Sequence, residues 1–295
     1  MRRQRTIGTF YFLGFICLQS PACFAQLADV RLRGDISIGV VKSDGIQSAS
    51  VTPLGRFSTL GLQAMLPVGV RINVIQRVSG FKNDVDDDGF DEYSIEDQGS
   101  WKVGKQYLPF GGGTLLRETA IAARIDSSLI FEGLPLALAL VDQGSGRQYG
   151  VSARVGSRGQ GVSVAFGKHF GINGTSFAVV NRSSTGEHSG WGRMYGADWN
   201  RRFGRFNAKV EGVILRAPEA NQNDEEWLDL SLGYDLGVNK RHSVLVGATT
   251  EIGTNLIFYR VQGVYTAQKG VQLEGLYRQN SNGFLDFSIF LRLRF

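Results

Sequence analysis

The last twelve residues, FLDFSIFLRLRF (Phe284–Phe295), alternate between two kinds of side chain. Successive residues of a β-strand point to opposite faces of the sheet, so every second residue shares a face. One face of this stretch carries only large apolar side chains: Leu285, Phe287, Ile289, Leu291, Leu293 and Phe295. The other face is mostly polar: Asp286, Ser288, Phe290, Arg292 and Arg294. Such a strand suits one side of a soluble sandwich, or the wall of a membrane barrel with lipid outside and water inside.

The same alternation recurs along most of the chain, and strand length separates the two folds. Strands of soluble proteins commonly run about 5–6 residues, whereas a strand that crosses a bilayer needs about 9–11. Many of the alternating runs here are of the longer kind, so the sequence predicts an all-β, transmembrane antiparallel β-barrel. We expect about 14 strands, within a range of 12 to 16, and place them at 29–41, 52–65, 69–81, 98–109, 131–142, 147–157, 160–170, 189–203, 205–216, 226–237, 242–252, 256–267, 270–279 and 284–295.

The connections alternate between short and long, as they do in outer-membrane barrels with short periplasmic turns and longer external loops. Short turns are expected at 66–69, 203–205 and 267–270, and longer polar loops at 82–97, 170–188 and 217–225. The segment 110–130 is long and alternates less. Because it begins with three glycines, we interpret it as a loop folded into the pore, where it forms a constriction.

The first 25 residues predict an export signal. Arg2, Arg3 and Arg5 precede an apolar stretch of about a dozen residues, and small residues stand at Cys23 and Ala25. This is the pattern of a secretory signal peptide, here 1–25, followed by the barrel at 26–295. A lipoprotein signal at Cys23 is the alternative, disfavoured because Ser20 stands where a lipobox usually has Leu.

Composition excludes several classes of protein. Both cysteines fall within the predicted signal, so the mature chain is expected to have no disulfide and no thiol chemistry. The 39 glycines and 6 prolines suit a chain made mostly of strands, because proline leaves a sheet short of one donor. Loss of the three N-terminal arginines leaves 29 basic and 27 acidic residues, a balance that does not suggest a nucleic-acid partner.

With its predicted signal peptide, its amphipathic strands and a last strand ending in Phe295, the chain resembles a Gram-negative outer-membrane porin. The resemblance implies an outer-membrane location, and recognition of Phe295 as an assembly signal by the barrel-assembly machinery. It also implies contact with membrane lipid and lipopolysaccharide and passage of small hydrophilic solutes, and it leaves homo-oligomerisation open. A narrower stretch, Val103–Gly111 followed by Arg117–Thr119, is similar to a motif of siderophore-uptake and phosphate-selective-type porins.

An acidic segment, NDVDDDGFDE (Asn83–Glu92), has the spacing of a calcium loop. Alternate carboxylates followed by Gly89 can converge on one hard cation, and glycine allows the sharp turn. The candidate ligands are Asp84, Asp86, Asp88 and Glu92, with Ca²⁺ as the implied ion. The twelfth position is Ile95 rather than Glu, so the pattern departs from an EF-hand, and a solvated acidic loop is the competing interpretation.

The polar faces of the predicted strands would line the pore, where charged residues decide which ions pass. The basic candidates are Arg31, Arg33, Arg71, Arg77, Arg154, Lys209, Arg260, Arg278, Arg292 and Arg294. The acidic candidates are Asp35, Glu211, Asp229, Asp235, Glu251, Glu274 and Asp286. They predict a slight bias towards anions, unless these residues pair with one another across the wall.

Two functions compete. The first is a passive or solute-selective diffusion channel, and the second is a structural or adhesive barrel with a closed lumen and functional external loops. An enzyme is not expected, because none of His169, His188 and His242 is recognisably grouped with a serine and an acid.

Overall fold

The protein is described by a computed structural model that covers 29–43, 46–50, 58–78, 89–97, 100–115, 119–131, 134–142, 149–157, 159–170, 191–216, 224–237, 241–254, 256–283 and 285–295. The predicted signal peptide, 1–25, lies outside these residues. Within this part of the chain, no helix has the length and apolar character that crossing a membrane would require.

Antiparallel strands make up the fold. The strands are β1 (Asp29–Ser43), β2 (Ile46–Ser50), β3 (Thr59–Met65), β4 (Val70–Arg77), β5 (Phe90–Asp97), β6 (Trp101–Tyr107), β7 (Thr119–Phe131), β8 (Leu134–Asp142), β9 (Tyr149–Ser157), β10 (Gln160–Phe170), β11 (Trp191–Phe203), β12 (Phe206–Arg216), β13 (Glu225–Leu236), β14 (His242–Glu251), β15 (Ile257–Gln268), β16 (Val271–Asn280) and β17 (Leu285–Arg294).

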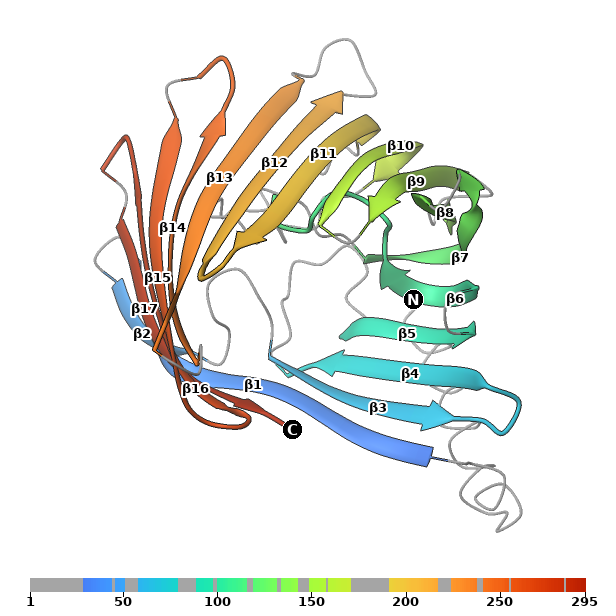
Figure 1. Cartoon of the computed structure of the whole chain (residues 1–295), viewed down its shortest axis with the longest axis horizontal. Coiled ribbons are helices and arrows are strands. Elements are labelled where there is room, and N and C mark those ends of the chain that lie inside the picture. The colour runs from blue at the N-terminus through green and yellow to red at the C-terminus, as the bar shows by residue number, and fades with distance from the viewer. Residues whose placement is uncertain are drawn as a thin grey trace, which may run out of the picture.

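The sheet closes on itself through β1 (Figure 1). Neighbouring strands pair in sequence order from β3 to β17, and β17 then pairs with β1. On its other side, β1 pairs with β2 through Gly39–Ser43 and with β3 through Asp29–Asp35. Strands β2 and β3 pair with successive parts of the same edge of β1, so together they occupy one position in the wall. The 17 strands therefore form a closed barrel of 16 strand positions. The expected number of about 14 was therefore wrong, although 16 lies at the upper limit of the predicted range.

Two of the strands were missed because their alternation is weak. Strand β5 lies inside the segment expected to be an external loop at 82–97, and its sequence, FDEYSIED, carries few apolar residues. Strand β7 occupies most of 110–130, which was expected to fold into the pore. Its inward face includes Ala120 and Ala122, and small apolar residues there remove the contrast between the two faces.

The outer face of the barrel is an apolar belt, as the alternation predicts. Large side chains stand exposed on it from strands all round the wall, among them Leu32, Val103, Ile125, Val162, Leu230, Val261 and Ile289. A soluble monomer rarely exposes so continuous an apolar surface. A bilayer makes this exposure favourable, because the apolar side chains then contact lipid instead of water.

The two ends of the barrel differ in the lengths of their connections. At the end that carries Phe295, neighbouring strands are joined by a few residues, as at 66–69, 158–159, 204–205 and 269–270. At the opposite end the connections include 78–89, 108–118 and 171–190. Gly204 and Gly270 adopt positive φ in two of the short turns, a conformation that glycine reaches without strain. The predicted asymmetry of short turns and long loops is thus present.

Candidate functional site

Three carboxylates stand side by side on the inner wall of the barrel. Asp198 on β11 is the cross-strand partner of Glu211 on β12, which is in turn the partner of Asp229 on β13. All three are buried, with at most 9% of their surface exposed. Like charges directly opposite one another in a sheet destabilise it. Each carboxylate in this row is compensated, and each in a different way.

Asp198 pairs with Arg154, which comes from β9 on the far side of β10. One guanidinium nitrogen, Nη2, donates to Asp198 Oδ2 at 2.8 Å, and Nη1 donates to the other carboxylate oxygen. Nη1 also donates to the carbonyl oxygen of Gly111 at 2.9 Å. The two-pronged geometry matches the planar fork of arginine to the carboxylate. Arg154 therefore binds both the wall and the segment that follows β6.

Asp229 is held by strands on its other side. Arg260 from β15 donates from Nη2 to Asp229 Oδ1 at 2.8 Å and from Nη1 to Oδ2. The hydroxyl of Thr249 on β14 donates to Asp229 Oδ2 at 2.6 Å. Asp229 and Thr249 are fully buried and Arg260 is 8% exposed, so the group forms a closed polar cluster.

Glu211, the middle carboxylate, is bound by backbone N–H groups of the segment that follows β6, and it makes no ion pair with a described residue. The amide of Gly112 donates to Oε1 at 3.0 Å, and the amides of Thr114 and Leu115 donate to Oε2 at 2.6 and 3.2 Å. Consecutive amides that converge on one anion form an anion-binding concavity of the backbone. The segment after β6 thus stabilises the carboxylate of Glu211 by hydrogen bonds from its backbone.

The glycines of this segment are required by the close approach of its backbone to the wall. Gly111 has φ +57°, and a Cβ there would collide with Glu211 Oε1. A Cβ at Gly112 would lie 3.2 Å from the Cβ of Asp198 and 3.3 Å from Glu211 Oε2. The glycine run that was predicted to begin a loop folded into the pore therefore has a specific cause.

Apolar contacts hold the same segment against the wall. Leu108, Phe110 and Leu115 are buried in a cluster with inward-facing apolar side chains of seven strands: Ala122, Ala139, Val141, Ala165, Met194, Val213, Leu215, Trp227 and Phe258. Residues 108–115 leave the wall at the end of β6 and contact strands from β9 to β13, so they cross the inside of the barrel. We name residues 108–115 the inner segment. The prediction of a loop inside the pore is correct for 110–115 and wrong for 119–130, which belongs to β7.

Most of the predicted pore-lining charges form ion pairs with charged side chains of the barrel wall, several of which were not in the predicted set. Arg71 donates to Glu96 at 3.0 Å, and Arg77 to Asp91 at 3.3 Å. Arg278 pairs with Asp286. Arg292 donates to Asp35 at 2.6 Å and to Glu274 at 2.8 Å. Other members of the predicted set form the ion pairs Arg31–Asp29, Arg202–Asp235 and Arg294–Asp35.

Sequence reasoning did not select several charged partners in these pairs. Glu96 and Asp91 lie on β5, the strand that was expected to be a loop. Asp198 lies on a strand that was predicted, and its place two residues from Asn200 on the polar face was a signal that could have found it. Of the three other predicted pore-lining residues, Arg33 lies on β1, Lys209 on β12 and Glu251 on β14.

The predicted calcium ligands separate into two groups. Asp84, Asp86 and Asp88 lie outside the described residues. Glu92 lies on β5, where its Oε2 accepts a hydrogen bond from Lys102 Nζ at 2.9 Å. Across the described ranges, no cluster of three or more histidine, cysteine or acidic side chains could hold a metal ion.

Phe295, the predicted assembly signal, lies at the seam that closes the barrel. Its backbone exchanges hydrogen bonds with Gly34 of β1, at 3.1 Å from Phe295 N and 3.0 Å from Gly34 N. Its ring covers Gly34, where a Cβ would collide with it. The ring is 61% exposed on the outer face.

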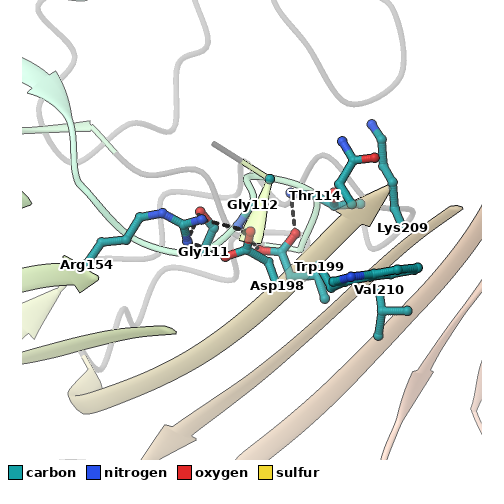
Figure 2. Close-up of a pocket in the computed structure, with 11 residues that line it drawn as sticks. Gly111, Gly112, Thr114, Arg154, Asp198, Trp199, Lys209 and Val210 are labelled. Atoms are coloured by element: carbon teal, nitrogen blue, oxygen red, sulfur yellow. Dashed lines mark hydrogen bonds and ion pairs between the residues drawn. The ribbon is translucent and has the colours of Figure 1, made fainter. Parts of the chain in front are cut away.

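A cavity of about 300 Å³ lies between the inner segment and the wall. Residues of β9, β11 and β12 line it, with Gly111, Gly112 and Thr114 on the side of the inner segment. Figure 2 shows Arg154 at one side of this site and Lys209 at the other, with Asp198 and the glycines between them. The site therefore offers charges of both signs beside the backbone of the inner segment.

Solved structures of outer-membrane proteins have the same fold. A loop-deletion variant of OmpT from Vibrio cholerae aligns over 90% of this chain and 99% of its own, at 11% identity and a TM-score of 0.62. The outer-membrane channel DcaP of Acinetobacter baumannii aligns over 90% and 97%, at 13% identity and a TM-score of 0.58. The anion-selective porin from Comamonas acidovorans aligns over 90% and 99%, at 13% identity and a TM-score of 0.55.

No protein-family model and no curated relative matches the sequence. At identities of 11–13%, the structural likeness establishes the fold. That fold is the closed, porin-like β-barrel of these outer-membrane proteins.

Proposed function

We propose that this porin-like barrel forms an aqueous channel through which small hydrophilic solutes diffuse across the outer membrane. The observation that carries the proposal is the closed wall of 16 strands with charged residues on its inner face. An eight-stranded barrel is filled by its own side chains, whereas barrels of 16 to 18 strands leave a water-filled channel. Channel-forming barrels among the similar structures support the same function.

The inner segment narrows this channel without closing it. It is held to one side of the lumen, against strands between β7 and β15, by the apolar cluster and by Glu211. Charged side chains also line strands that the inner segment does not contact, such as Arg292, Asp35 and Glu274 on β17, β1 and β16. A polar inner face on that side suits water rather than a packed core.

We propose weak selectivity between small ions. The sequence alone suggested a slight excess of basic residues, but most of these charges are paired with acids that lie on the next strand or the next but one. A paired charge contributes less to the potential along the pore than a free one. We propose further that the short-turn end is periplasmic, and that the chain assembles with copies of itself. OmpT of Vibrio cholerae has been solved in a trimer form.

The competing function is a structural or adhesive barrel with a closed lumen.

We expect no enzymatic activity. The ring of His242 stacks on Tyr265 with the centroids 4.4 Å apart, and its Nδ1 accepts a hydrogen bond from the Thr266 amide. These contacts suit an aromatic girdle at a membrane interface, where rings with a polar edge gather.

Conductance across a planar lipid bilayer tests the proposal. Refolded protein should give stepwise current increases, and a salt gradient should give a reversal potential close to zero. Heat-modifiable migration on a gel should establish in the same preparation that the barrel is folded, and a urea-denatured sample serves as the control. Folded protein that inserts and conducts no current would refute the channel and favour the closed barrel.

A further inference from the structure

The cavity under the inner segment is lined by one cation that makes no ion pair with a described residue. Its lining includes two acids and two bases: Asp198, Glu211, Arg154 and Lys209. Asp198 is bound by Arg154, and Glu211 accepts three backbone hydrogen bonds. Over the described part of the chain, Lys209 makes no ion pair. The ammonium of Lys209 is therefore available to a solute in the cavity.

The neighbours of Lys209 on the wall explain why it makes no ion pair with any residue that the structure describes. Its cross-strand partners are Asn200 on β11 and Ser231 on β13, and both side chains are neutral. The nearest acids on those strands, Asp198 and Asp229, lie one step along the same face and are bound to Arg154 and Arg260. A lysine whose cross-strand partners are neutral, and whose nearby acids are already hydrogen-bonded to other groups, keeps its attraction for an external anion.

We propose that this cavity is a binding subsite for small monocarboxylate solutes, with the solute carboxylate against Lys209 Nζ. This inference rests on the proposed channel function and specifies a class of solute for it. Asn200, which also lines the cavity, supplies a further hydrogen-bonding group beside the ammonium. The volume of about 300 Å³ suits an acid of a few carbon atoms.

The charges around Lys209 favour a monocarboxylate over an anion of higher charge. One free ammonium can neutralise one negative charge. A second charge, as on sulfate, would lie in the field of Asp198 and Glu211, which line the same cavity. A site with a single charged contact binds weakly, and weak binding is what a conducting channel requires, because the solute must also leave.

Saturation-transfer NMR on the refolded protein in detergent micelles measures this binding directly. Butyrate should give a saturable signal, and butyramide, its neutral analogue, should give little. Loss of one charge-assisted hydrogen bond should weaken butyrate binding by about tenfold or more in Lys209→Gln. Lys209→Arg should retain binding, because it keeps the charge.

Lys269→Gln is the matched control. Lys269 lies in the short turn between β15 and β16, so the substitution removes the same charge outside the lumen and should leave butyrate binding unchanged. Equal butyrate affinity in wild type and Lys209→Gln would overturn the subsite. Equal affinity for butyramide, or tighter binding of sulfate than of butyrate, would overturn it as well.

Bilayer recording separates failure of the subsite from failure of the channel. If Lys209→Gln conducts like wild type and butyrate binding does not depend on Lys209, the subsite is wrong and the channel stands. If wild type binds butyrate through Lys209 and conducts no current, the subsite stands in a closed barrel and the proposed channel is wrong.

Discussion

Replacement of Glu211 by alanine should release the inner segment from the wall. The carboxylate accepts three backbone hydrogen bonds, and a hydrogen bond to a charged group contributes about 1.5–3 kcal/mol. The freed amides meet water in the lumen, so the lower end of that range applies, about 4–5 kcal/mol in total. Removal of Glu211 also relieves its repulsion of Asp198 and Asp229, worth about 0.2–1 kcal/mol for each.

The net cost of Glu211→Ala is then about 3 kcal/mol, which changes the ratio of bound to released inner segment by about 100-fold. The apolar contacts of Leu108, Phe110 and Leu115 remain, so the segment should move between bound and released positions rather than leave the lumen. Single-channel recording should therefore show larger and noisier open-channel current than wild type. Glu211→Gln keeps one acceptor oxygen and should lie between the two.

Gly111→Val perturbs the same contact from the other side. Its side chain would collide with Glu211 Oε1, and its φ of +57° strains a β-branched residue. It should reproduce the noise of Glu211→Ala. Glu226→Ala is the control, because Glu226 lies on the same β12–β13 hairpin, where it pairs with Arg216 on the outer face. Wild-type current and noise in both Glu211→Ala and Gly111→Val, in heat-modifiable protein, would refute the anchoring role of Glu211.

Three further predictions concern the membrane and the acidic segment. Ile289, mid-strand on the apolar face of β17 and 45% exposed, should lower the free energy of unfolding by about 2–4 kcal/mol when replaced by Arg, measured by urea titration in lipid vesicles. An effect no larger than that of Ile289→Leu would place the residue away from lipid. Phe295→Ala should reduce the amount of heat-modifiable barrel in the membrane fraction, and normal levels would remove its assembly role. A triple change to Asn should abolish weak Ca²⁺ binding, with a dissociation constant of about 10⁻⁴–10⁻³ M, in calorimetry, and wild type without any calcium-dependent heat would refute the site. The residues changed are Asp84, Asp86 and Asp88.

The barrel and the facing of its residues could be predicted from sequence, because the period of two is a property of the local chain. In β17 the large residues at odd positions from Leu285 to Leu293 face outward, as the pattern alone indicated. The glycine run at Gly111–Gly113 likewise indicated a segment that leaves the wall. Strand number was less accessible, since β5 and β7 have little contrast between their faces.

The arrangement of charges inside the barrel depends on tertiary structure alone. The hydrogen bonds to Glu211 join residues 96 to 99 positions apart, and Arg154 and Asp198 are 44 positions apart. No local pattern encodes these pairs, because the register of each strand and the closure of the barrel decide which side chains become neighbours. From the sequence, Lys209 was one of ten basic lumen candidates. Its place beside the cavity, and its neutral cross-strand partners Asn200 and Ser231, distinguish it among the residues that the structure describes.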